Sequence, residues 1–253
     1  MSQPKEIIIT HKPKPKTRRG RGFKNKSKTQ NLVILGNNVS GFSGRVDSFN
    51  TLVKMLNPAV TMLQESKLYK KGTYKLENHC VFEKLRESNE GGGLMTIIHE
   101  NLEPVLIPTE NSSKMSLNVL VVEAKIQNYK IRFINSYGVQ ENSSAEERAE
   151  FYSILEEEII ITQDNGRMLC LEMDANAKLG HLYIKGDPNE MSPNGKLLLC
   201  LIKRYNLIVI NGTDKCSGVI TRMRTKGNKT EKSVIDFFYC LSIFIPDGCQ
   251  NGY

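Results

Sequence analysis

The sequence has none of the patterns that mark membrane-spanning, secreted or zinc-binding chains. No apolar run approaches the roughly 20 residues that cross a bilayer, and the run Ile7–Ile9 is far too short for the core of a signal peptide. The six cysteines include no pair at Cys-x-x-Cys spacing, which disfavours both a zinc site and a disulfide scaffold. We therefore expect reduced thiols, no membrane partner, and a nuclear or cytoplasmic location.

The net charge of +8 belongs to one end of the chain rather than to its body. Residues 1–30 contain ten Lys and Arg but a single acid, Glu6, whereas residues 31–253 carry a net charge of −1. The first segment is poor in apolar residues and is broken by proline and glycine, so we expect a disordered basic arm. Such an arm neutralises nucleic-acid phosphates or serves as a nuclear address; the alternative is a merely solubilising tail.

The remaining residues, 31–253, have the pattern of one α/β domain. Short apolar runs predict strands at 32–35, 59–63, 94–98, 117–124, 130–136, 168–173, 207–210, 221–224 and 233–239. Apolar residues at helical spacing predict helices at 46–56, 145–161 and 193–205. The chain's 39% hydrophobic and 25% charged residues are ordinary for a globular protein.

Polar side chains stand at or just after the ends of five of these strands. They are Asn38, Glu65, Tyr137, Asp174 with Asn176, and Asp236. Each has an ordinary interpretation: Glu65 as a solvated loop residue, Tyr137 as a core residue, and Asp174 as the start of an Asx turn. Five such endings on strands that can share a sheet suggest instead a single cleft.

Carboxylates and amides dominate this cleft, and no Ser–His or Cys–His pair accompanies them. Oxygen ligands of this kind are what Mg²⁺ prefers, so the composition suits a divalent cation acting on a phosphate ester. The segment Gly91–Gly93 adds only weak support for phosphate binding, because it lacks the Lys and Ser/Thr of a P-loop.

Five short motifs, in order along the chain, resemble those of the endonuclease/exonuclease/phosphatase superfamily. They are Asn38-Val-Ser-Gly, Leu63-Gln-Glu-Ser-Lys, Asn135-Ser-Tyr, Met173-Asp-Ala-Asn-Ala and Ser233-Val-Ile-Asp-Phe. Together with the stretches Gly186-Asp-Pro-Asn and Ser192-Pro-Asn-Gly, they are most similar to the apurinic-type endonuclease domains of non-LTR retrotransposons. The resemblance covers about residues 31–240.

This resemblance implies a four-layer α/β sandwich, with two mixed β-sheets face to face and helices outside. It also implies phosphodiester hydrolysis on DNA with Mg²⁺ or Mn²⁺. In the roles that it implies, Glu65 binds the metal with Asn38 nearby. Tyr137 and Asn176 stabilise charge on the phosphate, and Asp174 orients the attacking water or serves the leaving oxygen. Asp236 orients a catalytic histidine.

The sequence departs from the family in its C-terminal part. The family ends in a strand with Ser-Asp-His, but no histidine of this chain is preceded by Asp or follows Asp236, after which 17 residues remain. Met173 also replaces the usual Gly, and Ser40 stands where many relatives carry an acid or Asn. We therefore expect a domain that lacks its last strand. Because a general base contributes about 10²–10⁴-fold to the rate, we also expect cleavage to be reduced or absent.

Two other functions stay open. One is a non-catalytic nucleic-acid-binding protein that acts through the basic arm at residues 1–30. The other is a phosphatase of the same fold, acting on inositol or lipid phosphates.

Overall fold

The structure, a computed structural model, describes residues 5–10, 31–85, 92–109, 113–181, 183–184, 189–211, 213, 222–226 and 229–241. Its strands are β1 (Lys5–Thr10), β2 (Asn31–Asn38), β3 (Val60–Gln64), β4 (His79–Lys84), β5 (Leu94–His99), β6 (Val105–Ile107), β7 (Val119–Ile126), β8 (Tyr129–Tyr137), β9 (Met168–Asp174), β10 (Leu207–Val209), β11 (Arg222–Lys226), β12 (Lys229–Ser233) and β13 (Asp236–Leu241). Its helices are α1 (Val46–Leu56), α2 (Ala145–Asp164) and α3 (Pro193–Arg204), with short 3₁₀ helices η1 (Ser43–Arg45), η2 (Glu100–Leu102) and η3 (Lys114–Asn118). Within these ranges, no helix is long and apolar enough to span a membrane.

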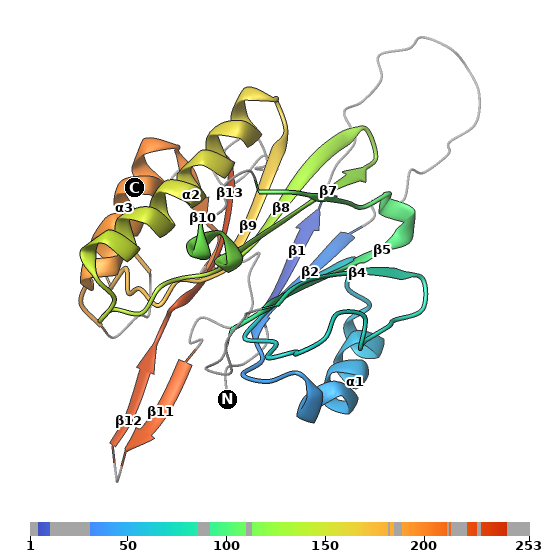
Figure 1. Ribbon diagram of the computed structural model, residues 1–253, viewed down its shortest axis with the longest axis horizontal. Coiled ribbons are helices and arrows are strands. Elements are labelled where there is room, and N and C mark those ends of the chain that lie inside the picture. Colours follow the sequence, from blue (N-terminus) through green and yellow to red (C-terminus); the bar gives the residue numbers. More distant parts are fainter. Residues whose placement is uncertain are drawn as a thin grey trace.

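Two mixed β-sheets form the body of the protein (Figure 1). Sheet A has the strand order β1-β2-β3-β5-β4, and sheet B has the order β10-β13-β9-β8-β7-β6. One pair in each sheet is parallel, β2 with β3 and β8 with β9, and the other pairs are antiparallel. The hairpin of β11 and β12 is a separate ribbon that projects from the sandwich.

The sheets pack face to face, and helices cover their outer faces. Between the sheets, Ile34 and Met62 of sheet A belong to one core with Phe133 and Phe238 of sheet B. The outer face of sheet A packs on α1, and the outer face of sheet B is covered by α2 and α3. The four-layer sandwich of two mixed sheets expected from the sequence is therefore confirmed.

Local signals explain where two of the helices begin and end. The Ser144 hydroxyl accepts a hydrogen bond from the Glu147 N–H, and the Glu147 carboxylate accepts one from the Ser144 N–H. This capping box satisfies N–H groups that have no partner within α2. The helix α1 ends at Leu56, because Asn57 adopts a left-handed conformation and Pro58 cannot continue the helix.

The predicted strands are present, with ends that differ by a few residues, whereas β1, β4, β6 and β12 were not predicted. Both β4 and β6 are edge strands, which are stabilised by a single neighbour and need no long apolar run. The strand β12 pairs antiparallel with β11 from Arg222 to Lys226.

Strand β1 differs from the disordered arm that we expected for residues 1–30. It pairs antiparallel with β2 along Lys5–Thr10. The run Ile7–Ile9 is β-branched and favours a strand, and the edge of β2 offers unpaired backbone groups. Residues 11–30 lie outside the described residues, so the remainder of the arm stays a prediction.

Strand periodicity turns the polar strand ends toward the space between the sheets. On β3, Met62 lies in the inter-sheet core, so Gln64, two residues on, shares its face. On β9, Cys170 lies in the same core, and Glu172 and Asp174 therefore point the same way. A shift of register by one residue would turn all of these side chains outward.

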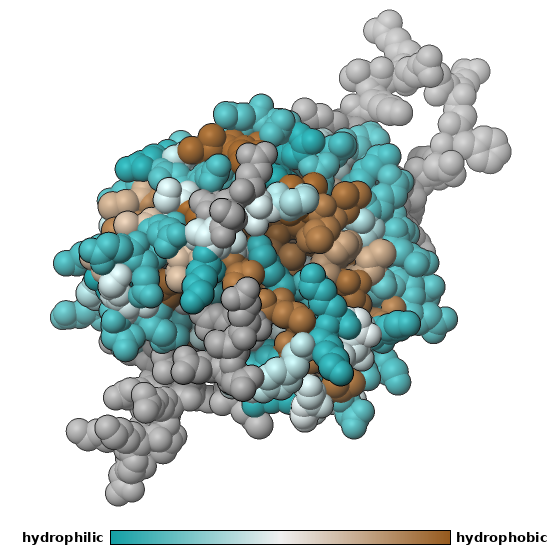
Figure 2. Space-filling model, viewed as in Figure 1, coloured by the Kyte–Doolittle hydropathy of each residue, from teal (hydrophilic) through white to brown (hydrophobic). Residues whose placement is uncertain are grey.

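Hydrophilic residues cover most of the face shown in Figure 2, with apolar residues near its middle. Among the described residues, the large apolar side chains with the highest exposure are Met55 and Tyr69, each 75% exposed. Tyr69 lies in the loop that follows the strand end at Glu65.

Gly36 marks the closest approach of the two sheets. A Cβ atom added there would lie 2.5 Å from Cζ of Phe238 and 2.7 Å from Cγ of Glu172. Both neighbours are fully buried, so neither can move aside without disturbing the core. The sheet separation at this point requires glycine.

We expect Gly36→Ala to lower the free energy of unfolding by about 1–3 kcal/mol, because overpacking strains a close-packed core. Gly44→Ala is the matched control, since a Cβ atom there meets nothing within 4 Å. Urea denaturation followed by circular dichroism would measure both. Equal stability of the two variants would contradict the close approach at Gly36.

Candidate active site

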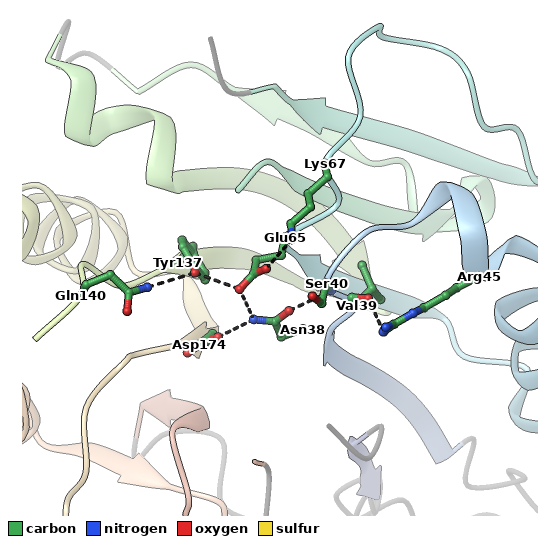
Figure 3. A network of polar contacts seen from close by, with 9 residues as sticks. All are labelled: Asn38, Val39, Ser40, Arg45, Glu65, Lys67, Tyr137, Gln140 and Asp174. Carbon is green, nitrogen blue, oxygen red and sulfur yellow. Dashed lines mark hydrogen bonds and ion pairs between the residues drawn. The ribbon is translucent and has the colours of Figure 1, made fainter. Parts of the chain in front are cut away.

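A polar network joins the two sheets at the end where β2, β3, β8 and β9 finish (Figure 3). The Asn38 side-chain nitrogen donates to Oε1 of Glu65 at 3.0 Å and to Oδ2 of Asp174 at 2.6 Å. Its amide oxygen accepts the backbone N–H of Ser40 at 3.0 Å. One amide from sheet A thus holds two carboxylates, one of which belongs to sheet B.

Glu65 is the centre of this network. Its Oε1 atom also accepts a hydrogen bond from the Tyr137 hydroxyl at 2.9 Å, and its Oε2 atom lies 3.3 Å from Nζ of Lys67. The Tyr137 oxygen in turn accepts a hydrogen bond from the Gln140 amide at 3.2 Å. The carboxylate therefore has three partners from three segments of the chain.

Asp174 and Asn176 form an Asx turn, and Asp174 also belongs to the polar network. Oδ1 of Asp174 accepts the Asn176 N–H at 3.1 Å, while Oδ2 accepts from Asn38. The Asn176 amide donates to the Gly138 carbonyl at 2.8 Å. Asp236 lies directly opposite Asp174 in the antiparallel pair of β13 and β9.

Four residues with left-handed backbone conformations lie at this end of the sheets. Ser40, Glu65, Lys67 and Asn176 have φ values of 45°, 50°, 50° and 44°. A non-glycine residue in this region costs of order 1–3 kcal/mol, and such residues gather at functional sites. Backbone hydrogen bonds hold the strained loops, among them Gly41 N–H to Glu65 O at 2.7 Å.

The glycine run after β4 supports the backbone of the site. The carbonyls of Gly92 and Gly93 accept the N–H groups of Lys67 and Ser66 at 2.9 and 3.1 Å. Gly93 has a φ of 87°, and a Cβ atom there would lie 2.7 Å from Oγ of Ser66. These glycines therefore allow a close approach to the Glu65 loop; Gly91 lies outside the described residues.

The environments of Glu65 and Tyr137 fix their protonation. Burial alone would raise the pKa of Glu65, but hydrogen bonds from Asn38 and Tyr137 and the Lys67 ammonium outweigh it, so that its pKa lies below its usual value. Burial and the nearby carboxylates raise the pKa of Tyr137 well above its usual value. Glu65 is therefore ionised near neutral pH, and Tyr137 keeps its proton as a donor.

Asp174 behaves in the opposite way. Burial raises its pKa to about 8, the Asp236 carboxylate adds to this rise, and the hydrogen bond from Asn38 opposes it. Two carboxylates bound by one amide therefore differ in protonation because their surroundings differ. The pattern is that of a buried site with more negative charge than its own cations neutralise.

Behind the network, a fully buried polar cluster ties the sheets together. The Gln64 amide donates to Oδ1 of Asn135 at 2.7 Å and to Oε2 of Glu172. The Asn135 amide donates to the carbonyls of Leu63 and Met95 at 3.1 and 3.0 Å. Gln64, Asn135 and Glu172 have no exposed surface, and each lies one or two residues before a member of the network.

Solved structures with a similar fold come from DNA-processing proteins. The endonuclease domain of TRAS1, a telomere-specific non-LTR retrotransposon, has a TM-score of 0.64 and 18% identity, covering 83% of this chain and 85% of that one. The AP endonuclease LMAP from Leishmania major has a TM-score of 0.65 and 14% identity, covering 83% and 78%. TDP2 from D. rerio, complexed with a single-strand DNA product, has a TM-score of 0.52 and 13% identity, covering 85% and 86%. Comparisons with protein-family models and with curated proteins found no match.

The chain has the endonuclease/exonuclease/phosphatase fold. This fold brings the predicted residues Asn38, Glu65, Tyr137, Asp174, Asn176 and Asp236 to one end of its two sheets. Lys67 and Gln140 belong to the same network but were not predicted. For Lys67 the signal is its position two residues after Glu65; for Gln140 we find none in the sequence.

The described part of this chain shows neither a metal-ligand cluster nor a histidine in the network. No group of three or more His, Cys, Asp or Glu side chains there is arranged to hold a metal ion. Nor does a described histidine join the network: His79 pairs with His99 at the end of sheet A opposite Glu65, and His181 contacts Asn189.

We expect Gln64→Leu to lower the free energy of unfolding by about 1–3 kcal/mol, because it removes a buried donor to Glu172. The double variant Gln64→Leu/Glu172→Leu should lose less than the sum of the two single variants, since both members of the pair then become apolar. Urea denaturation of all four proteins gives the coupling energy. Simple additivity would mean that the Gln64–Glu172 contact has no energetic role.

The raised pKa of Asp174 predicts a pH dependence with a defined sign. Its carboxyl has a pKa of about 8 in the folded chain against a usual 3.8, so folding takes up a proton between these values. Its contribution to stability is therefore largest below about pH 4 and declines up to about pH 8. In EDTA, the stability of Asp174→Asn relative to the wild type should rise over that range in urea denaturation. A flat difference would contradict the assignment.

Proposed function

We propose that the chain hydrolyses phosphodiester bonds in DNA with a divalent cation, Mg²⁺ or Mn²⁺. The observation that carries this proposal is the pair of carboxylates, Glu65 and Asp174, which the Asn38 amide bridges. The Tyr137 hydroxyl donates a further hydrogen bond to Glu65. The fold supports the same chemistry, and the names of its neighbours, AP endonucleases among them, support DNA as the substrate. The likeness to TRAS1 supports a retroelement endonuclease.

The residues present suit a hard divalent cation. Glu65 and Asp174 offer carboxylate oxygens, whereas Asn38 turns its side-chain nitrogen toward both of them. The raised pKa of buried Asp174 reflects negative charge that a cation would neutralise. We assign the cation to Glu65, with Asn38 and Asp174 beside it. When bound, it supplies neutralisation of phosphate charge and activation of water.

The other residues act on the substrate directly. Tyr137 keeps its proton and donates a hydrogen bond to a phosphate oxygen, and the Asn176 amide supplies a second donor. Asp174 holds the attacking water or serves the leaving oxygen. Asp236 lies opposite Asp174 in the pair of β13 and β9. No histidine serves as base among the described residues, so we expect slow cleavage.

Positive charge near the site supports a nucleic-acid substrate. The β11–β12 ribbon contains Arg222, Arg224, Lys226, Lys229 and Lys232 in its sequence. It ends at Ser233, three residues before Asp236, so it is rooted beside the network. The basic arm would add non-specific contacts to phosphates, in a nuclear or cytoplasmic protein.

A second candidate is a phosphatase with the same site. The 3' phosphatase NExo from Neisseria, bound to a product DNA hairpin, has a similar fold with a TM-score of 0.59 and 14% identity. The third, a non-catalytic nucleic-acid binder, rests on the sequence of residues 1–30.

We expect the full chain to nick supercoiled plasmid slowly in Mg²⁺ and to stop in EDTA. Glu65→Gln should abolish nicking, and Tyr137→Phe should slow it about 100-fold or more, as for loss of one donor to a developing charge. Tyr129→Phe is the matched control, because Tyr129 lies at the opposite end of β8 from Tyr137 and is 46% exposed. Agarose gels give the rates.

Other outcomes favour the alternatives. Phosphate release from inositol or lipid phosphates without nicking would assign a phosphatase. Binding without any turnover, lost when residues 1–30 are deleted, would assign a nucleic-acid-binding protein.

A further inference from the structure

The loop from Ser66 to Leu76, called here the lysine loop, connects β3 to β4 and begins directly after Glu65. It contains four lysines, Lys67, Lys70, Lys71 and Lys75, and the two acids of the β3–β4 connection, Glu65 and Glu77, flank it. Residues 31–253 as a whole carry a net charge of −1, so this loop is a local concentration of positive charge. Lys67 is engaged by Glu65, while Lys70, Lys71 and Lys75 are exposed.

The lysine loop is anchored at several points, although its charged residues face solvent. Leu68 and Tyr74 are buried, at 8% and 7% exposure. Tyr74 donates to Oδ1 of Asn50 at 2.7 Å, and the Gly72 N–H donates to Oε2 of Glu83 at 2.6 Å. The loop is therefore a built surface with fixed contacts to α1 and β4.

Tyr69 is the exception among the aromatic residues of this region. It lies between the buried Leu68 and the exposed Lys70, and it is 75% exposed. Burial of this ring in the core would stabilise the fold by roughly 2 kcal/mol, and the exposed position of Tyr69 does not provide this stabilisation. An exposed aromatic ring followed in the chain by two lysines, Lys70 and Lys71, suits a surface on which nucleic-acid bases stack while phosphates are paired.

The distance from the network is short on the scale of a DNA strand. Tyr69 is four positions after Glu65, and a chain spans at most about 3.6 Å per residue, so their Cα atoms lie within about 14 Å. A strand of DNA rises about 3.4 Å per nucleotide. A strand held at Glu65 therefore reaches Tyr69 within about four nucleotides.

A pocket of about 500 Å³ separates part of the loop from β4. Lys71, Tyr74 and Lys75 line it on the loop side, and His79 and Phe82 line it on the strand side. Glu83 also lines this pocket, whereas Tyr69 and Lys70 do not, so the pocket is separate from the surface formed by those two residues.

We propose that the lysine loop docks the DNA strand on one side of the scissile phosphate. Lys70 and Lys71 pair with its phosphates, and an unpaired base stacks on Tyr69. This inference rests on the proposed function, because it assumes that DNA is held at Glu65. It adds a preference for substrates with unpaired nucleotides within about four positions of the cleavage point.

The stacking contact can be tested by binding in EDTA, where no cleavage is needed. The probe is a single-stranded oligonucleotide containing 2-aminopurine, whose fluorescence is quenched when the base stacks on an aromatic ring. With the full chain, Tyr69→Ala should lose the quenching and weaken binding about tenfold, which corresponds to 1.4 kcal/mol. Tyr69→Phe should keep both the quenching and the affinity. Tyr129→Ala is the matched control, because it removes the same side chain from the start of β8 in sheet B.

The phosphate contacts predict a change in salt dependence. Lys70→Ala/Lys71→Ala should reduce the slope of log affinity against log salt by about 1.4, the value for two phosphates of a single strand. The control is Lys125→Ala/Lys130→Ala, which removes the same charge from side chains that are 53% and 61% exposed. These lysines lie at the end of β7 and β8 away from Tyr137, so the double variant should change the salt slope less.

Two results would overturn the proposal: wild-type chain that does not bind the probe, or Tyr69→Ala that quenches and binds like Tyr129→Ala. Plasmid nicking in Mg²⁺ keeps the proposed function separate from this surface. Nicking by the wild type with unchanged behaviour of the Tyr69 variants rejects the docking surface alone. Quenching at Tyr69 without nicking rejects the enzymatic function and keeps the surface.

Discussion

The structure depends on a buried polar contact between two sheets that otherwise pack through apolar side chains. Gln64, Asn135 and Glu172 have no exposed surface and bond to one another across the interface. Separating these partners would leave buried polar groups unpaired, which costs more than a hydrogen bond gains, so the cluster favours this relative placement of the sheets. Because Glu65, Tyr137 and Asp174 follow these residues within two positions, that placement also determines the geometry of the site.

Much of this arrangement could be predicted because it is encoded locally. The two-residue period of a strand decides which side chains share a face, and apolar runs such as Met168–Met173 identify the strands. The polar strand ends at Asn38, Glu65 and Asp174 could therefore be assigned to one cleft before the strand order was known. The capping box at Ser144 is local in the same sense, and α2 begins where it predicts.

What could not be predicted depends on contacts between distant segments. Glu65 and Lys67 both have left-handed backbone conformations, so their ion pair depends on the conformation of the loop and not on the strand period of β3. The role of Gly93 follows from Ser66, a residue 27 positions earlier. Strand β1 needs the free edge of β2; its own sequence, surrounded by lysines and prolines, resembles a disordered arm.

The network also shows how charge limits the chemistry at this end of the sheets. Asn38 and Tyr137 donate to the same oxygen of Glu65, and the Lys67 ammonium faces the other, so a cation that binds this carboxylate competes with three donors. The hydrogen bonds that Asp174 accepts from described residues come from Asn38 and Asn176, neither of which is charged. Its pKa rises to about 8. Under the proposed function, a cation held at Glu65 would offset the negative charge that raises the pKa of Asp174 beside it. It would also release Lys67 from Glu65, so that the ammonium could pair with an incoming phosphate.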